Sequence, residues 1–121
     1  MIKLLRVDHR LLHGQIVYSW CSQIKPNCIL VANDEVVENE IRKAALRLAK
    51  PNETKLVFKS INDSVTAINE GKTDKYDLMI VVNNIEDAVK LAEQCPQVSS
   101  INLGGTKANE LTHAISNKIG R

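Results

Sequence analysis

The sequence predicts an α/β protein with an open, mainly parallel β-sheet and helices on both faces, in a three-layer αβα arrangement. Two observations favour this fold class. Short apolar runs rich in β-branched residues alternate along the chain with segments whose apolar residues recur at helical spacing. In addition, the run at residues 78–82 is continuously apolar, which is typical of a strand covered on both faces. We therefore expect this run at the centre of the sheet.

The apolar runs are the expected strands. They span Ile2–Val7, Asn27–Ala32, Lys55–Lys59, Asp77–Val82 and Val98–Leu103. Because helical segments separate them, right-handed crossovers would make neighbouring strands parallel. Open parallel sheets bind ligands beyond the carboxyl ends of their strands, so we expect functional residues in the loops that follow the strands.

The segments between the strands carry apolar stripes at helical spacing. These stripes comprise Ile16, Val17, Trp20, Cys21 and Ile24; Val37, Ile41, Ala44 or Ala45, and Leu48; Ile61, Val65 and Ile68; and Ile85, Ala88, Val89 and Ala92. We expect each stripe to pack on the sheet, with Trp20 in the core. Ser60 is expected to cap the third helix and Gly71 to end it. The less regular tail after Gly105 predicts only a short last element.

The composition is that of one soluble globular domain, which we take to be residues 1–121. Its 121 residues, 44% hydrophobic and 25% charged, are enough for a single core. No apolar run approaches the roughly 20 residues of a membrane-spanning helix. The charged start also lacks the apolar region of a secretory signal, so we expect a cytoplasmic protein. A net charge of +2 and few aromatic residues argue against nucleic-acid binding.

The chain has three cysteines, Cys21, Cys28 and Cys95. They are odd in number, widely spaced and set in apolar stretches, which favours buried thiols over disulfides or a zinc site. We therefore assign them no chemistry.

The loop after the first expected strand carries the candidate chemistry. His13 stands just before a helix, where unpaired backbone N–H groups and the helix dipole favour an anion. If His13 holds a phosphoryl group, Gly14 and Gln15 can donate backbone hydrogen bonds to its oxygens. Arg10 offers a charged fork for phosphate oxygens. Asp8 can hydrogen-bond the imidazole and set which ring nitrogen is the nucleophile.

Each of these residues also has a simpler interpretation, which local chemistry leaves open. His13 could be a surface or capping residue, and Arg10 could be a solvated charge. Asp8 could end the strand or cap the turn. His9 and His13 have metal-ligand spacing, but no Cys or further His nearby completes a ligand set, so we expect neither a metal nor a cofactor.

Two other loops are candidates for the same edge of the sheet. Asn33 and Asp34, after the second strand, could face the His13 loop or could cap a helix that begins at Glu35; capping is favoured. The segment Gly104–Lys107, after the fifth strand, could lie near a phosphate or form a flexible turn, and neither interpretation is preferred.

A long motif surrounds His13. It consists of Arg6, Val7, Asp8, His9, Arg10, Leu11, Leu12, His13, Gly14, Gln15, Ile16, Val17 and then Trp20. This motif resembles the N-terminal signature of the IIB components of the mannose, fructose, sorbose and N-acetylgalactosamine class of the bacterial phosphoenolpyruvate-dependent sugar phosphotransferase system. His9 departs from it, since an acidic residue is common there. Weaker similarities at residues 31–36, 48–51 and 101–105 extend the resemblance along the chain.

The resemblance implies a phosphocarrier that is cytoplasmic and peripherally associated with membrane transporter subunits. It implies that His13 accepts a phosphoryl group from a IIA protein or domain and passes it to a sugar at the IIC and IID subunits. The corresponding activity is that of a protein-Npi-phosphohistidine–sugar phosphotransferase, with Asp8 and Arg10 assisting. Family members are usually some tens of residues longer. We therefore expect a fragment or a shortened relative whose uncovered sheet edge favours aggregation, a partner strand or a homodimer.

Two rival functions fit parts of the sequence. A receiver domain of a two-component system is of similar size and class, but it needs a phospho-accepting aspartate at the end of the third strand, where Lys59 and Ser60 stand. A non-catalytic module could instead hold a phosphorylated ligand at the same helix terminus without covalent chemistry.

Overall fold

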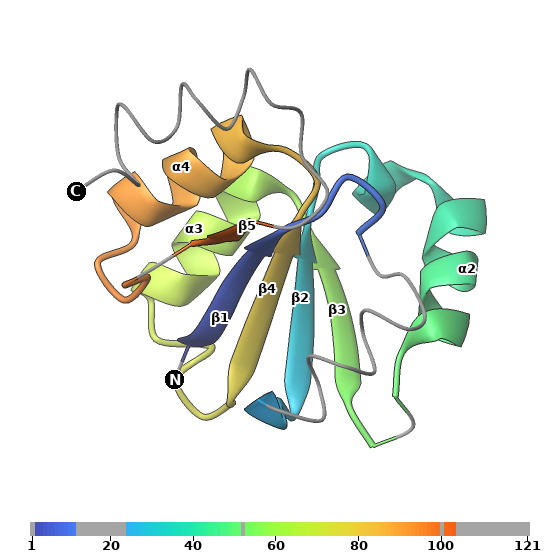
Figure 1. Ribbon diagram of the computed structural model, residues 1–121, viewed down its shortest axis with the longest axis horizontal. Coiled ribbons are helices and arrows are strands. Elements are labelled where there is room, and N and C mark those ends of the chain that lie inside the picture. The colour runs from blue at the N-terminus through green and yellow to red at the C-terminus, as the bar shows by residue number, and fades with distance from the viewer. Residues whose placement is uncertain (1, 12–23, 52, 100, 104–121) are drawn as a thin grey trace.

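The computed structural model describes residues 2–11, 24–51, 53–99 and 101–103. Within these ranges the core is a five-stranded parallel sheet of strand order β3-β2-β4-β1-β5. The strands are β1 (Ile2–Val7), β2 (Cys28–Ala32), β3 (Lys55–Lys59), β4 (Leu78–Val82) and β5 (Asn102–Leu103). The continuously apolar run forms β4, which lies in the middle of the sheet as predicted (Figure 1).

The two faces of the sheet support two separate cores. Helices α3 (Ile61–Asn69) and α4 (Ile85–Gln94) cover one face, while the 3-10 turn η1 (Val36–Glu38) and α2 (Glu40–Ala49) lie on the other side (Figure 1). Successive residues of β4 point to opposite faces, so Ile80 packs beneath α3 and α4 whereas Val81 packs towards α2. This arrangement confirms the predicted α/β class with helices on both faces.

The start and end of α3 follow the predicted chemistry. Ser60 Oγ accepts a hydrogen bond from the backbone N–H of Asp63, 3.1 Å away, and so caps the helix. Gly71 follows the helix with φ of +79°, a left-handed conformation that glycine adopts without a steric penalty. Its N–H donates to the carbonyl of Ile68 at 3.1 Å. Both predictions for this helix are confirmed.

The predicted packing face of α2 is wrong. Ile41 and Leu48 are 86% and 88% exposed, and Leu46 is instead the buried residue of the helix. The preceding turn buries Val36, and Asn39 then caps α2 by accepting from the N–H of Arg42 at 2.9 Å. The turn and the cap set the rotation of α2 about its axis so that Leu46 packs in the core. The larger apolar stripe, which the spacing predicted to be buried, therefore faces solvent.

The predicted fifth strand is too long. Among the described residues of this range, Asn102 and Leu103 are the ones that pair with β1. Val98 instead follows a turn in which its N–H donates to the carbonyl of Cys95 at 3.0 Å. Val98 packs in the core beneath α4, so its apolar character reflects burial without strand pairing. The predictions for the helix containing Trp20 and for the tail after Gly105 lie outside the described residues.

Two of the three cysteines can be assessed. Cys28 and Cys95 are buried free thiols, as expected, and burial raises the pKa of both. Cys21 lies outside the described residues. Among the helices that the structure describes, none is both long and apolar enough to span a bilayer.

Candidate functional site

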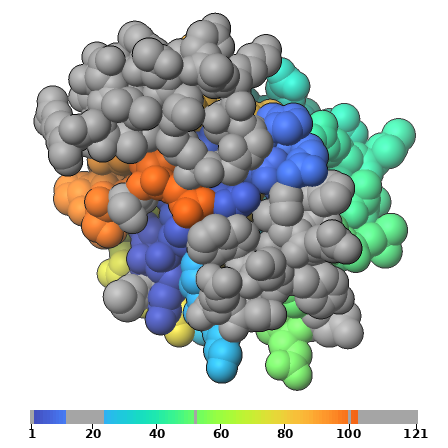
Figure 2. All heavy atoms as spheres, viewed as in Figure 1, coloured from blue at the N-terminus to red at the C-terminus, as the bar shows by residue number. Residues whose placement is uncertain are grey.

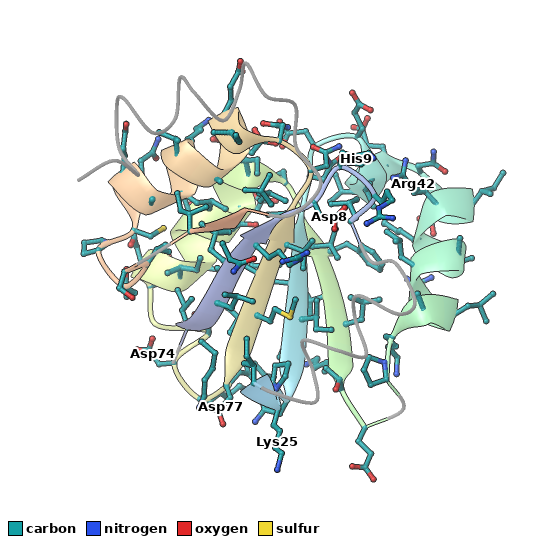
Figure 3. The ribbon with its side chains drawn as sticks, in the orientation of Figure 1. Asp8, His9, Lys25, Arg42, Asp74 and Asp77 are labelled. Atoms are coloured by element: carbon teal, nitrogen blue, oxygen red, sulfur yellow. The ribbon has the colours of Figure 1, made fainter. Side chains whose placement is uncertain are left out.

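The site begins where β1 ends, at the carboxyl edge of the sheet. Past the strand, the N–H of Asp8 still donates to the carbonyl of Val82 in β4 at 2.9 Å. Asp8 and His9 therefore lie at this edge, together with Arg42 of α2, whereas Asp74 and Asp77 lie at the opposite edge (Figure 3). The carboxyl edge is where open parallel sheets bind ligands.

A tight turn fixes the residues that follow β1. The N–H of Leu11 donates to the carbonyl of Asp8 at 2.8 Å, and Leu11 has φ of +58°, which is unusual for a residue with a branched side chain. The Leu11 side chain is 2% exposed and packs in the core on the α2 side. Burial of Leu11 thus holds a strained turn in place, with His9 and Arg10 exposed between its ends.

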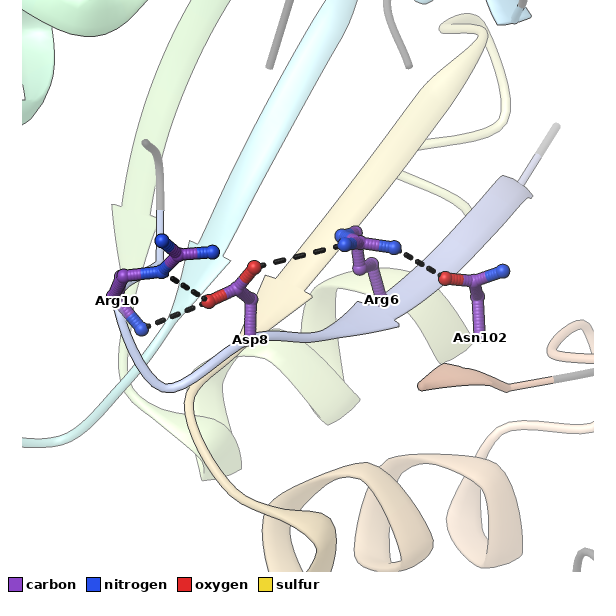
Figure 4. A network of polar contacts seen from close by, with 4 residues as sticks. All are labelled: Arg6, Asp8, Arg10 and Asn102. Atoms are coloured by element: carbon purple, nitrogen blue, oxygen red, sulfur yellow. Dashed lines mark hydrogen bonds and ion pairs between the residues drawn. The ribbon is translucent and has the colours of Figure 1, made fainter. Parts of the chain in front are cut away.

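The carboxylate of Asp8 is the centre of a polar network (Figure 4). Its Oδ1 accepts from the backbone N–H of Arg10 at 3.0 Å and from Arg10 Nε at 3.4 Å. Its Oδ2 lies 3.6 Å from Nη2 of Arg6. Nη1 of Arg6 in turn donates to Oδ1 of Asn102 in β5 at 2.5 Å. The network therefore joins the loop after β1 to β5, the edge strand that pairs with β1.

Burial makes this network energetically demanding. The side chain of Asp8 is fully buried and that of Arg6 is 10% exposed, so each charge depends on the other for compensation. Burial lowers the pKa of Arg6 from its usual value, and the negative charge of Asp8 opposes this effect. Among the described residues no donor makes a hydrogen bond to Oδ2 of Asp8. A buried acceptor of this kind has capacity for one further donor.

The structure places some of the predicted site residues and not others. Asp8 and Arg10 lie together, as their predicted shared role requires. The carboxylate of Asp8 accepts from both the backbone N–H and the side-chain Nε of Arg10. His13, Gly14 and Gln15 lie outside the described residues, so their roles stay predictions. Gly104–Lys107 also lies outside. Within the described part of the chain, no cluster of three or more His, Cys, Asp or Glu residues is arranged as a metal site.

Sequence reasoning missed two members of the network, Arg6 and Asn102. Arg6 is directly opposite Asn102 in the parallel pairing of β1 with β5. A charged residue between the buried Leu5 and Val7 was a detectable feature, because a buried charge requires a partner. The identity of that partner depends on the order of the strands.

The residues after β2 act as caps. Oδ1 of Asn33 accepts from the N–H groups of Glu35 and Val36 at 3.0 and 2.9 Å, which confirms the favoured interpretation. Asp34 caps a different helix from the one predicted: its Oδ1 accepts from the N–H of Ile61, the first residue of α3, at 2.8 Å. Both side chains are thereby used to hold elements of the fold.

The fold and site together define a parallel α/β domain with a buried carboxylate and two arginines at the carboxyl edge of its first strand. Residues 2–120 match the family described as the PTS system sorbose subfamily IIB component. The chain belongs to this family.

Three relatives place the chain within the family. A probable phosphotransferase enzyme IIB component of Streptococcus pyogenes is 35% identical over 103 residues, which cover 85% of this chain and 63% of the relative. The crystal structure of the IIBSor domain of the sorbose permease from Klebsiella pneumoniae is 28% identical, with a TM-score of 0.81, over 88% of this chain and 66% of that one. The mannose-specific EIIAB component of Escherichia coli is 28% identical over 120 residues, 98% of this chain and 37% of the relative. The chain thus spans just under two thirds of the length of the first two.

Proposed function

We propose that this protein is a phosphocarrier that accepts a phosphoryl group on His13 from a phosphorylated IIA protein and transfers it to a sugar. The observation that carries the proposal is the turn after β1, in which the buried Asp8 fixes Arg10 close in sequence to His13. Membership of the IIB family supports the same function. In this proposal the protein is cytoplasmic and meets its sugar acceptor at IIC and IID membrane subunits.

Arg10 is suited to bind the phosphoryl group during transfer. Its Nε contacts Asp8 at 3.4 Å, yet its side chain is 42% exposed. The anchored Nε leaves the two terminal nitrogens as a fork whose orientation is restricted. Such a fork matches the oxygens of a phosphoryl group and offsets their negative charge as bonds form and break. Gly14 and Gln15 would add backbone N–H donors at the start of the following helix.

Asp8 is suited to orient the imidazole of His13. The nucleophilic ring nitrogen must carry a lone pair, so the proton must reside on the other nitrogen. An N–H donated to Oδ2 of Asp8 would set that tautomer and would satisfy the acceptor that lacks a hydrogen bond among the described residues. The transfer then breaks the N–P bond of the donor histidine and forms an N–P bond on His13. In the second step a sugar hydroxyl oxygen bonds to phosphorus while the electron pair of the N–P bond returns to the ring nitrogen of His13, and the hydroxyl proton passes to water.

A IIA protein or domain is the proposed donor. The Escherichia coli relative is named as an EIIAB component, which joins the A and B functions in one protein. This supports a IIA partner for the present chain, supplied either separately or by fusion. The named sugars of the relatives differ, so the sugar is left unassigned.

Isotopic labelling tests the proposal. The chain is incubated with phosphoenolpyruvate labelled with ³²P, the general phosphotransfer proteins and a matching IIA protein. We expect acid-labile, base-stable label on the wild type and no label on His13→Ala. The matched control is His9→Ala, which removes an exposed histidine from the same loop and should retain the label. Absence of label on the wild type excludes the carrier function, and label that survives His13→Ala excludes His13 as the acceptor and so overturns the proposal. Reversible phosphate binding without label would favour the non-catalytic module.

A further inference from the structure

The solvent-facing side of α2 is apolar. Ile41 and Leu48 are the large hydrophobic residues that are strongly exposed in the described part of the chain, at 86% and 88%. They are seven residues apart, so they share one side of the helix, and the exposed Ala44 and Ala45 lie between them. We call these four residues the α2 stripe. In the space-filling view, the atoms of α2 form one margin of the molecule (Figure 2).

Charged groups of opposite sign border the α2 stripe. Glu40 and Arg47 are also seven residues apart and therefore lie on one flank of it. Oε1 of Glu40 accepts from Nζ of Lys43 in the same helix at 3.4 Å, and the side chain of Glu40 is still 79% exposed. The guanidinium of Arg47 lies 5.4 Å from the ring centroid of Phe58 in β3, which holds the positive charge beside the stripe. When one copy is reversed, the exposed Glu40 of one helix faces Arg47 of the other, so opposite charges meet along this flank.

We propose that the α2 stripe binds a second copy of the same chain, with the two α2 helices antiparallel about a twofold axis between Ala44 and Ala45. Ile41 and Leu48 lie three residues on either side of that alanine pair, so Ile41 of one copy is level with Leu48 of the other. The small alanines allow the helix backbones to approach closely. Glu40 falls about 3 Å along the axis from Arg47 of the second copy, on the same flank. Each dimer thus contains two such charge pairs.

The composition of β3 favours the helix over the β3 edge of the sheet as the surface of association. The edge strand β3 has Lys55 and Lys59 at its two ends, and terminal lysines oppose edge-to-edge strand pairing. A helix of 10 residues is only about 15 Å long, so the area buried per copy is below the roughly 800 Å² of a standard interface. The dimer is therefore weak and forms in a concentration-dependent manner.

Analytical ultracentrifugation tests the dimer. Between about 10 μM and about 1 mM protein, we expect the weight-average mass of the wild type to rise from 13.5 kDa towards twice that value. Leu48→Glu should weaken the dimer about tenfold or more, because it places a charge in the proposed interface. The circular dichroism should stay unchanged, because the side chain of Leu48 is exposed in the single chain. The control Thr66→Glu adds the same charge at an exposed position of α3 and should dimerise like the wild type.

A charge exchange tests the antiparallel geometry. Glu40→Arg and Arg47→Glu should each weaken the dimer, because each places like charges together across the axis. The double variant carrying both changes restores opposite charges and should recover most of the affinity. A wild type that stays monomeric, Leu48→Glu that dimerises normally, or a double variant weaker than both single variants would overturn the proposal. Phosphorylation of His13 is measured on the same variants, so failure of the dimer and failure of the carrier function are distinguished.

Discussion

The guanidinium of Arg6 in β1 donates to the side-chain oxygen of Asn102 in the paired strand β5, although the two residues are 96 positions apart in the chain. The same guanidinium lies 3.6 Å from the carboxylate of Asp8. The last described strand therefore stabilises the loop that follows the first strand, although its own residues are remote from that loop in sequence. This link makes the candidate site sensitive to changes in β5.

Replacement of Asn102 tests this link. Asn102→Ala removes the acceptor for Arg6, so we expect the free energy of unfolding to fall by about 1–3 kcal/mol. Phosphoryl transfer should slow as well, because the position of Asp8 depends on Arg6. Urea denaturation and single-turnover labelling measure the two effects. Asn102→Asp retains an acceptor for Arg6 and should preserve transfer better than Asn102→Ala; equal activity in all three proteins would contradict a positioning role.

Arg10 should be important for transfer and much less so for stability. Arg10→Ala removes the proposed phosphate fork but retains the backbone N–H that Asp8 accepts. We expect transfer to slow by about 10²-fold or more, while the free energy of unfolding falls by no more than about 1 kcal/mol. Quenched-flow labelling and thermal unfolding separate these outcomes. Arg10→Lys keeps the charge without the fork and should be intermediate. Unfolding of Arg10→Ala at room temperature would assign the residue to the fold instead.

Asp8 should contribute strongly to the stability of the fold. Its carboxylate is fully buried between two guanidinium groups, so Asp8→Ala leaves Arg6 buried without its counter-charge. We expect a loss of about 3–5 kcal/mol in the free energy of unfolding, measured by chemical denaturation. Asp8→Asn keeps the oxygen that accepts from Arg10 and should be less destabilised. Similar stability in all three proteins would show that the buried charge pair contributes little to folding.

Local patterns predicted most of the fold, because strands and caps depend on neighbouring residues. The continuous apolar run identified the central strand β4, and Ser60 and Gly71 marked the ends of α3. The orientation of α2 was not predictable in this way. Burial of Val36 and Leu46 fixes which side of α2 faces the sheet, and this leaves Ile41 exposed. That outcome depends on how the helix packs on the sheet, which the spacing of apolar residues does not specify.

The candidate site was predictable to the same degree. Asp8 and Arg10 are close in sequence, so a motif in the loop sufficed to predict that they lie together, while their roles stay predictions. Arg6 and Asn102 meet only because β1 and β5 are adjacent in the sheet, which is a tertiary property. Likewise, Asp34 caps α3, whose first residue is 27 positions further along the chain. Interactions between distant segments are thus the part that periodicity and spacing leave open.

Asp87 provides a test by pH. Burial in the first turn of α4 raises the pKa of its carboxyl group from its usual value, and the nearby Asp34 adds to the rise, while a hydrogen bond from Asn84 opposes it. The folded protein therefore binds this proton more tightly than the unfolded chain does. The stabilising contribution of the protonated form is fully present below the unfolded pKa of about 3.9 and is lost as the pH rises through the folded pKa.

Replacement of Asp87 by Asn should remove this dependence. The amide oxygen can still accept from Asn84, and no charge forms as the pH rises. We expect Asp87→Asn to unfold at a slightly higher urea concentration than the wild type at pH 7, with a smaller difference at pH 4. The charge of Asp87 also interacts favourably with the N-terminus of α4, which limits the gain. Urea titrations at both pH values measure the difference, and an Asp87→Asn protein that is less stable at pH 7 would show that the helix terminus outweighs burial.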